Sequence, residues 1–156
     1  MDQRPSEDVA VMAIRERYVT RILDGSKRVE FRRTALRKVI SHVVVYESRG
    51  RGKIVGYFEV ANVTNAKPRK LWNLFSEAAG IGRSEFFEYF RGKEEGTGIS
   101  VGVFYRLDDP IDITSINPSY HPPQSFFYLQ DGEFERVLQR KAERAVCSSG
   151  SARVGF

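Results

Sequence analysis

The stretch GSKRVEFRR, residues 25–33, places a single carboxylate among four cations. Val29 and Phe31 alternate in it with Glu30 and Arg32, so the spacing predicts a strand with one apolar and one charged face. A carboxylate held among cations can accept a hydrogen bond from a base edge, while the cations contact phosphate or polarise a carbonyl group. The alternative is an ordinary surface ion pair between Glu30 and Arg32.

The positive charge of the chain is concentrated around this stretch. The 156 residues carry a net charge of +5, and residues 27–53 contain nine basic and two acidic residues, a local net charge of +7. Subtracting this from +5 leaves −2 for the rest of the chain. A basic zone on a slightly acidic body favours a polyanionic partner such as nucleic acid. The alternative is a solvated charged face that keeps the protein soluble.

The composition argues against several other kinds of site. The chain has two histidines, His42 and His121, and one cysteine, Cys147, with no carboxylates clustered at ligand spacing. We therefore expect neither a metal nor a cofactor. No apolar run approaches the roughly 20 residues that a membrane span needs, so we expect no membrane partner. A single cysteine cannot form an internal disulfide, which favours a reducing, cytoplasmic location.

The elements that must position the charged stretch follow from periodicity and turn residues. One domain is expected over 9–146, with flexible tails at 1–8 and 147–156. Strands are predicted for 10–14, 41–48, 53–63, 98–107, 108–116 and 126–129, and helices for 18–23, 68–80, 84–92 and 132–145. Residues 117–125 contain three prolines and are expected to be irregular. So many short strands around few helices predict a small closed or nearly closed sheet.

Two strands of this set form a hairpin whose tip carries arginine. The loop RGRG, residues 49–52, joins strands 41–48 and 53–63. Tyr46 and Tyr105 come late in predicted strands beside polar or basic residues, where a ring can stack on a base. Packing of these rings in the core, with a hydrogen-bonded hydroxyl, is the alternative.

The motifs DGSKRVEFRR and VVVYESRGRGKIVGYFEV together resemble the ASCH family. The resemblance rests on Gly25, Lys27, Glu30 and Arg32, on Tyr46, Ser48, Ile54, Val55 and Gly56, and on the later stretches GISVGVFYRLDDPIDI and PPQSFFYL. It implies an α+β fold, a PUA-like small β-barrel of about six strands flanked by helices. It also implies a cleft beside the barrel and a role in RNA binding connected with translation, RNA processing or transcription.

The function expected from these observations is RNA binding in a basic cleft. The cleft is bounded by Lys27, Glu30 and Arg32 and by the loop from Ser48 to Lys53. Phosphate contacts are expected from Arg49, Arg51 and Lys53, stacking from Tyr46 or Tyr105, and hydrogen bonds from Ser48, Gln124 and Ser125.

Two other functions remain open. In an enzyme acting on a modified nucleoside or on the RNA backbone, Lys27 would be a base or nucleophile and Glu30 would position water or substrate. Amidohydrolases of the resembled family use a lysine and a threonine on this strand, and Glu30 occupies the threonine position. A protein-interaction module would present the basic zone to an acidic partner.

Overall fold

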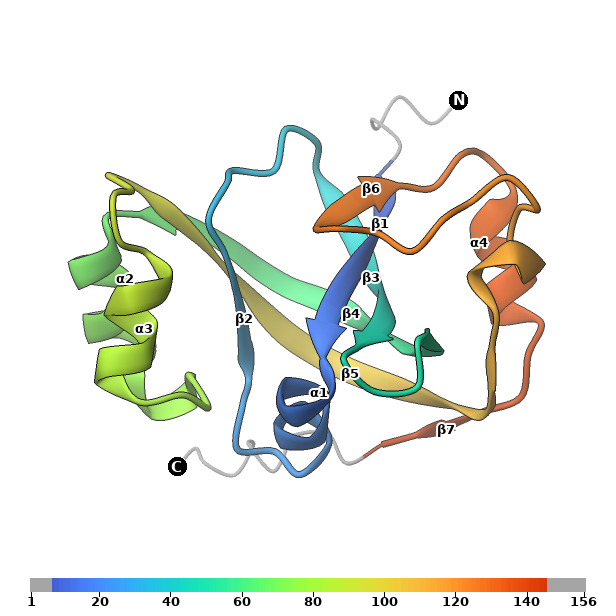
Figure 1. The fold of residues 1–156 in the computed structure, drawn as a ribbon, viewed down its shortest axis with the longest axis horizontal. Helices are drawn as coiled ribbons and strands as arrows, with labels where there is room; N and C mark the ends of the chain where they lie inside the picture. Colours follow the sequence, from blue (N-terminus) through green and yellow to red (C-terminus); the bar gives the residue numbers. More distant parts are fainter. Residues whose placement is uncertain (1–6, 146–156) are drawn as a thin grey trace, which may run out of the picture.

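The computed structural model describes residues 7–145, which fold around one mixed β-sheet. Its strands are β1 (Asp8–Arg15), β2 (Val29–Arg32), β3 (Ile40–Ser48), β4 (Lys53–Ala66), β5 (Gly96–Ile111), β6 (Phe126–Tyr128) and β7 (Ala142–Arg144). The strand order is β2-β5-β4-β3-β1-β6, and β7 pairs with β5 off this path. β1 and β3 are parallel and the other pairs are antiparallel. The sheet curls into a half-barrel (Figure 1), which confirms the expected PUA-like α+β fold.

Helices flank the half-barrel. They are α1 (Glu16–Leu23), α2 (Pro68–Phe75), α3 (Arg83–Tyr89) and α4 (Glu133–Leu138), with short 3₁₀ helices η1 (Ser76–Ala78) and η2 (Ile113–Ser115). In Figure 1, α2 and α3 form a helical pair beside β2, whereas α4 lies at the opposite end of the molecule. No helix within residues 7–145 is long and apolar enough to span a membrane.

The two longest strands bend strongly because their pairing is interrupted. The β4–β5 register shifts between Ile54 and Gly56, and twice more further along β4. Each such bulge bends the strand and increases its twist. A Cβ atom on Gly56 would lie 2.4 Å from the carbonyl oxygen of Tyr105, so only glycine fits at the first bend.

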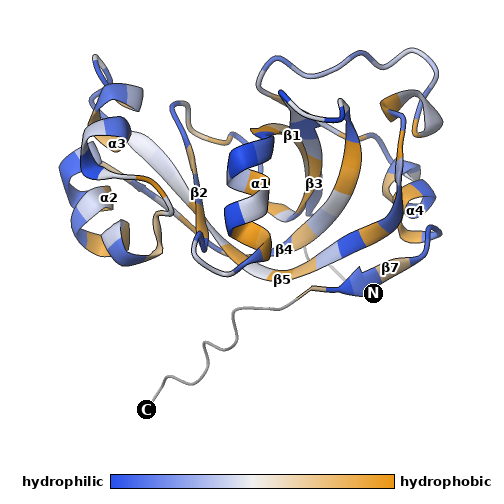
Figure 2. Ribbon diagram, turned by 60° about the horizontal axis from the view of Figure 1, so that its bottom comes forward, coloured by the Kyte–Doolittle hydropathy of each residue, from blue (hydrophilic) through white to orange (hydrophobic). Residues whose placement is uncertain are grey.

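Apolar cores lie on both faces of the sheet. Val9 and Val11 of β1 point into a core that includes Val137 of α4, while Ala10 and Met12 point into a second core covered by α1. A third core lies between β2 and the helical pair. Figure 2 shows the hydrophobic residues concentrated along the strands. β2 therefore lies where the half-barrel meets the helical pair.

Two predicted elements were wrong. Residues 108–116 do not form a separate partner strand, because β5 continues through Asp108 and Pro110 and pairs Ile111 with Ile54. A proline is tolerated near the end of a strand, where its fixed φ suits extended backbone. The helix predicted for 132–145 ends at Leu138, and 142–144 pair as β7 with Tyr105–Leu107 of β5. Sheet pairing overrides helix propensity there.

The predicted tails lie almost wholly outside the described residues. Residues 147–156 and 1–6 belong to the part of the chain that is not described, and Asp8 already begins β1. The other predicted elements match the structure to within a few residues, including the irregular segment 117–125.

Candidate functional site

β2 places Glu30 and Arg32 on one face and Val29 and Phe31 on the other. The two apolar residues belong to the core with the helical pair, where the Phe31 ring meets Phe86 edge-on at 4.9 Å between centroids. This confirms the predicted alternation. Glu30 and Arg32 are only 6% and 8% exposed, so the alternative of an ordinary surface pair was wrong.

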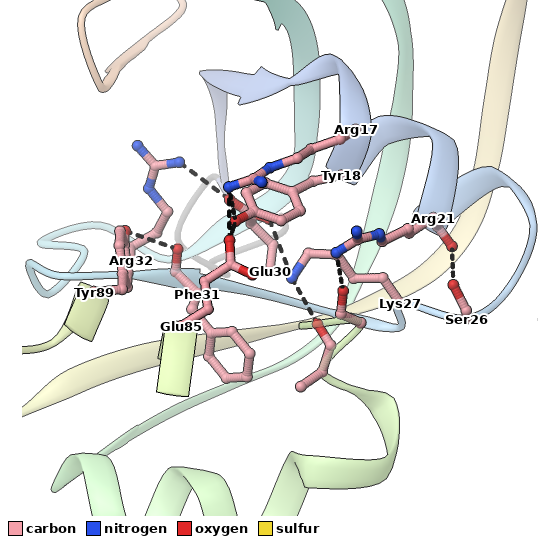
Figure 3. A network of polar contacts seen from close by, with 12 residues as sticks. Arg17, Tyr18, Arg21, Ser26, Lys27, Glu30, Phe31, Arg32, Glu85 and Tyr89 are labelled. Atoms are coloured by element: carbon pink, nitrogen blue, oxygen red, sulfur yellow. Dashed lines mark hydrogen bonds and ion pairs between the residues drawn. The ribbon is translucent and has the colours of Figure 1, made fainter. Parts of the chain in front are cut away.

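Glu30 lies between two cations (Figure 3). Arg32 Nη1 donates to Glu30 Oε2 at 3.2 Å, and Lys27 Nζ lies 3.9 Å from Glu30 Oε1. Lys27 is 3% exposed. Removing the charge of one member of such a buried group strongly destabilises a protein, because it leaves its partner uncompensated. The three side chains therefore form one electrostatic unit, which we call the β2 triad.

The ammonium group of Lys27 is enclosed on several sides. Its Nζ donates to the carbonyl oxygen of Ala79 at 2.9 Å and lies over the rings of Tyr18 and Phe31, 5.2 and 5.1 Å from their centroids. Burial lowers the pKa of Lys27, and the neighbouring Glu30 opposes that shift only in part. At a given pH, a larger fraction of Lys27 than of an exposed lysine is therefore the neutral amine, which can accept a proton.

Arg32 joins the two ends of the sheet. β2 and β6 are the terminal strands of the sheet order. Arg32 donates to the carbonyl oxygen of Ala13 in β1 at 3.3 Å and to Ser125 Oγ at 2.7 Å, just before β6. Ser125 is itself held to β1, because its carbonyl oxygen accepts from Ala13 N at 2.9 Å. The guanidinium thus bridges the opening of the half-barrel.

A second polar cluster connects α1 to α3 beside the triad. The Tyr18 hydroxyl donates to the Glu85 carboxylate, and Arg17 Nη2 donates to the same carboxylate at 2.7 Å (Figure 3). Burial raises the pKa of Tyr18, and Glu85 raises it further. Tyr89, also on α3, donates from its hydroxyl to the carbonyl oxygen of Phe31 at 3.1 Å. Burial raises the pKa of Tyr89 as well.

These groups surround a cavity of about 350 Å³, near the lower end of the range for small-molecule sites. Its lining comes from β1, α1, β2, the β3–β4 loop, α3 and the irregular segment before β6. The lining residues are Ala13, Ile14, Arg15, Tyr18, Lys27, Glu30, Phe31, Arg32, Ser48, Arg49, Ile81, Glu85, Tyr89, Pro123 and Gln124.

The structure brings together seven of the eleven residues predicted for the site. Lys27, Glu30, Arg32, Ser48, Arg49 and Gln124 line the cavity, and Ser125 bonds to Arg32. The other four residues lie elsewhere. Tyr46 is 8% exposed within a core, Tyr105 stacks on Tyr57, Arg51 lines a separate pocket, and Lys53 Nζ lies 3.9 Å from Asp112 Oδ1.

The β3–β4 loop separates its arginines. Arg49 has φ 59°, the one positive φ of a non-glycine residue within 7–145, and it lines the cavity, whereas Arg51 lies on the side of Glu47 and Val19. A run of basic residues in the sequence gives no sign of such a division. The sequence did not reveal Tyr18 and Glu85 as site residues either, because Tyr18 only marked the start of a predicted helix and Glu85 is 55 residues from Glu30 along the chain.

Residues 7–145 contain no group of three or more His, Cys, Asp or Glu side chains placed to hold a metal ion. The three charged groups of the β2 triad are paired with one another and with backbone carbonyl oxygens. Proton transfer, hydrogen bonding and anion binding are the chemistry that this arrangement can supply.

Comparisons with known proteins agree with this architecture. The family model described as ASCH domain matches residues 12–121. An ASCH domain-containing ribonuclease of Zymomonas mobilis is 23% identical over 145 residues, covering 88% of this chain and 95% of the relative. The crystal structure of ASCH from Zymomonas mobilis matches with a TM-score of 0.77 at 22% identity, over 87% of this chain and 96% of the other. A single-substitution variant of that protein gives a TM-score of 0.78 at 22% identity, over 88% and 100%.

Proposed function

The chain belongs to the ASCH domain family, and from that premise we propose that it binds single-stranded RNA by taking one nucleotide into the cavity beside β2. The observation that carries this proposal is the β2 triad. Three charged residues that are each less than 9% exposed line the same cavity of about 350 Å³. Ion pairs buried in this way add little to stability compared with an apolar core, so their presence favours a role in recognition.

The size of the cavity argues for an unpaired nucleotide. Sequence-specific recognition of RNA usually acts on unstacked bases that leave the strand and stack on aromatic side chains. Tyr18 and Tyr89 supply aromatic surface in the cavity wall, a role that Tyr46 and Tyr105 cannot take from their positions. Arg49 at the tip of the β3–β4 loop is exposed and supplies a phosphate contact at the mouth.

A second candidate function is RNA hydrolysis, favoured by the lowered pKa of Lys27 and by the ribonuclease relative. In this reaction a 2′-hydroxyl attacks the adjacent phosphorus and a neutral Lys27 amine accepts the hydroxyl proton. The bond to the 5′-oxygen breaks, that oxygen takes up a proton from water, and a 2′,3′-cyclic phosphate is left on the other fragment. A cationic Arg32 or Arg49 would stabilise the charge that develops on phosphate.

One experiment separates these candidates. Binding of a labelled single-stranded RNA is measured at low and moderate salt, and the recovered RNA is sized on a gel. Affinity that falls steeply with salt, with RNA of unchanged length, supports a binding module. Shortened RNA with the wild type but not with Lys27→Met supports hydrolysis. If RNA neither binds at low salt nor is shortened, both RNA functions are refuted.

A further inference from the structure

We infer that the β2 triad reads the imide edge of a pyrimidine ring, with uracil as the RNA base that carries it. This inference rests on the proposed function and adds to it which RNA base the cavity binds. It follows from the order of the three groups: Glu30 accepts in the centre, and Lys27 and Arg32 donate on either side (Figure 3).

Each member of the triad keeps hydrogen-bonding capacity for a ligand. Lys27 has three N–H donors, and one is bound to the carbonyl oxygen of Ala79. Arg32 has five, and its bonds to Glu30, Ala13 and Ser125 use three. The Glu30 carboxylate offers about four acceptor sites, and its hydrogen bond from Arg32 occupies one of them, because Lys27 at 3.9 Å is an ion-pair contact beyond hydrogen-bonding distance. The cavity therefore presents a donor, an acceptor and a donor.

The complementary ligand edge is an acceptor, a donor and an acceptor. Uracil presents O2, N3–H and O4 in that order on its Watson–Crick edge. Its imide hydrogen would meet Glu30, and its two carbonyl oxygens would meet Lys27 and Arg32. Each donor of the triad then faces an acceptor of the base, and the acceptor faces a donor. No polar group is therefore buried without a hydrogen-bond partner, and the penalty for burying an unsatisfied group is avoided.

Each of the other three bases leaves at least one of the three positions mismatched. Guanine presents O6, N1–H and an amino group, so its amino group would face one of the two cations. Cytosine presents O2, N3 and an amino group, which places an acceptor opposite the Glu30 carboxylate. Adenine has a single donor and a single acceptor on this edge. A mismatched hydrogen-bonding position costs on the order of tenfold or more in affinity, which sets the expected preference for uracil.

The test uses an eight-nucleotide RNA that is abasic at every position but one. The single base is uracil, cytosine, adenine, guanine or N3-methyluracil, so that all five probes share the same phosphates and the same electrostatic attraction. We expect uracil to bind about tenfold or more tightly than each of the others. N3-methyluracil is the matched control, because it keeps both carbonyl oxygens and loses only the imide hydrogen.

Thymine shares the imide edge, so a sixth probe carries 5-methyluracil on the same ribose backbone. Equal binding of uracil and 5-methyluracil is expected, since the methyl group lies off the edge being read. The same strand built on deoxyribose tells whether RNA or DNA supplies the base, and weaker binding of the deoxyribose strand is expected because it lacks the 2′-hydroxyl.

The results distinguish this inference from the proposed function. Equal affinity for uracil and N3-methyluracil, or tighter binding of guanine or cytosine, would overturn the base assignment while leaving RNA binding intact. If an ordinary single-stranded RNA fails to bind at low salt, the proposed function is lost as well. A Glu30→Gln variant adds a second test, since a glutamine amide can pair with cytosine as both donor and acceptor. Its preference is expected to shift from uracil towards cytosine.

Discussion

At the scale of single residues, the central feature is a carboxylate that is buried only because two cations are buried with it. Glu30 is 6% exposed, and the groups that compensate its charge, Lys27 and Arg32, come from within five residues of the chain. That local origin is why the sequence singled out these three residues. Their burial was not predictable, because it depends on Ala79, Ala13 and Ser125, which lie up to 93 positions away.

Lys27 makes the stability of the protein depend on pH. Because burial lowers its pKa, the unfolded chain binds more protons at this site than the folded chain when the pH lies between the lowered value and the ordinary value of about 10.4. The free energy of unfolding therefore rises with pH across that window. Below the lowered pKa the site is protonated in both states and its contribution is constant.

Urea unfolding over a pH series checks this prediction. The wild type is expected to gain stability relative to Lys27→Met as the pH rises towards about 10. Lys38→Met, at an exposed position, is the matched control. Parallel pH profiles for the wild type and Lys27→Met would contradict the account of Lys27.

Arg49 and Arg51 offer a paired test in one loop. Arg49 has φ 59°, a left-handed conformation that costs a residue other than glycine about 1–2 kcal/mol. Arg49→Gly removes this cost, but the greater freedom of glycine in the unfolded chain offsets part of the stability gained. We expect a net stabilisation of about 0.5–1 kcal/mol together with weaker RNA binding. Arg51→Gly has no such strain to relieve and is expected to destabilise by about 0.4–1 kcal/mol while RNA binding is largely kept.

Thermal unfolding and RNA titration of both variants measure these effects. Removing one phosphate contact lowers the slope of log affinity against log salt by about 1. A loss of binding that is equal in the two variants would show that the loop acts only through its net charge.

At the scale of elements, the segment between η1 and α3 fixes the position of Lys27. Gly80 has φ +68°, and a Cβ atom there would lie 2.4 Å from Cβ of Lys27. Gly92 has φ +81° with no atom within 4 Å of an added Cβ. Both glycines adopt the left-handed backbone conformation, but only at Gly80 does Lys27 also leave no room for a side chain.

Gly80→Ala is therefore expected to be more damaging than Gly92→Ala. The left-handed conformation costs alanine about 1–2 kcal/mol at both positions, and the overlap with Lys27 adds about 1–3 kcal/mol at Gly80 alone. Denaturant unfolding measures both losses. Under conditions where both variants are folded, RNA binding should fall only in Gly80→Ala. An equal loss of stability would mean that Lys27 moves aside freely.

Element prediction succeeded where a local pattern decides the structure and failed where a distant partner does. The alternation in β2 and the end of α1 at Leu23 were readable from the sequence, and Gly25 just after α1 has a positive φ of 85°, which is typical of a glycine that ends a helix. β7 was missed because only its pairing with β5 makes residues 142–144 a strand. The split of the β3–β4 loop between two pockets likewise depends on the position of α1.

At the scale of the whole molecule, the half-barrel is incomplete at the site where the chemistry is proposed. β2 and β6 end the sheet order, and the bond from Arg32 to Ser125 connects them beside the cavity. Helix α3 on one side and the β3–β4 loop on another complete the wall of the cavity. The family resemblance predicted the barrel and its cleft. That α1 and α3 form part of the cavity wall could be seen only from the three-dimensional structure.

RNA binding in the cavity beside β2 is tested most directly by titrating the isotopically labelled protein with a short single-stranded RNA and following the NMR signals of individual residues. We expect saturable shifts that begin at Lys27, Glu30, Arg32 and Arg49, while Lys53 and the exposed Arg37 respond weakly. The same RNA annealed to its complement should bind more weakly, because its bases are paired. Shifts centred on Lys53 or Arg37, with the β2 triad unmoved, would contradict the claim that the cavity is the binding site.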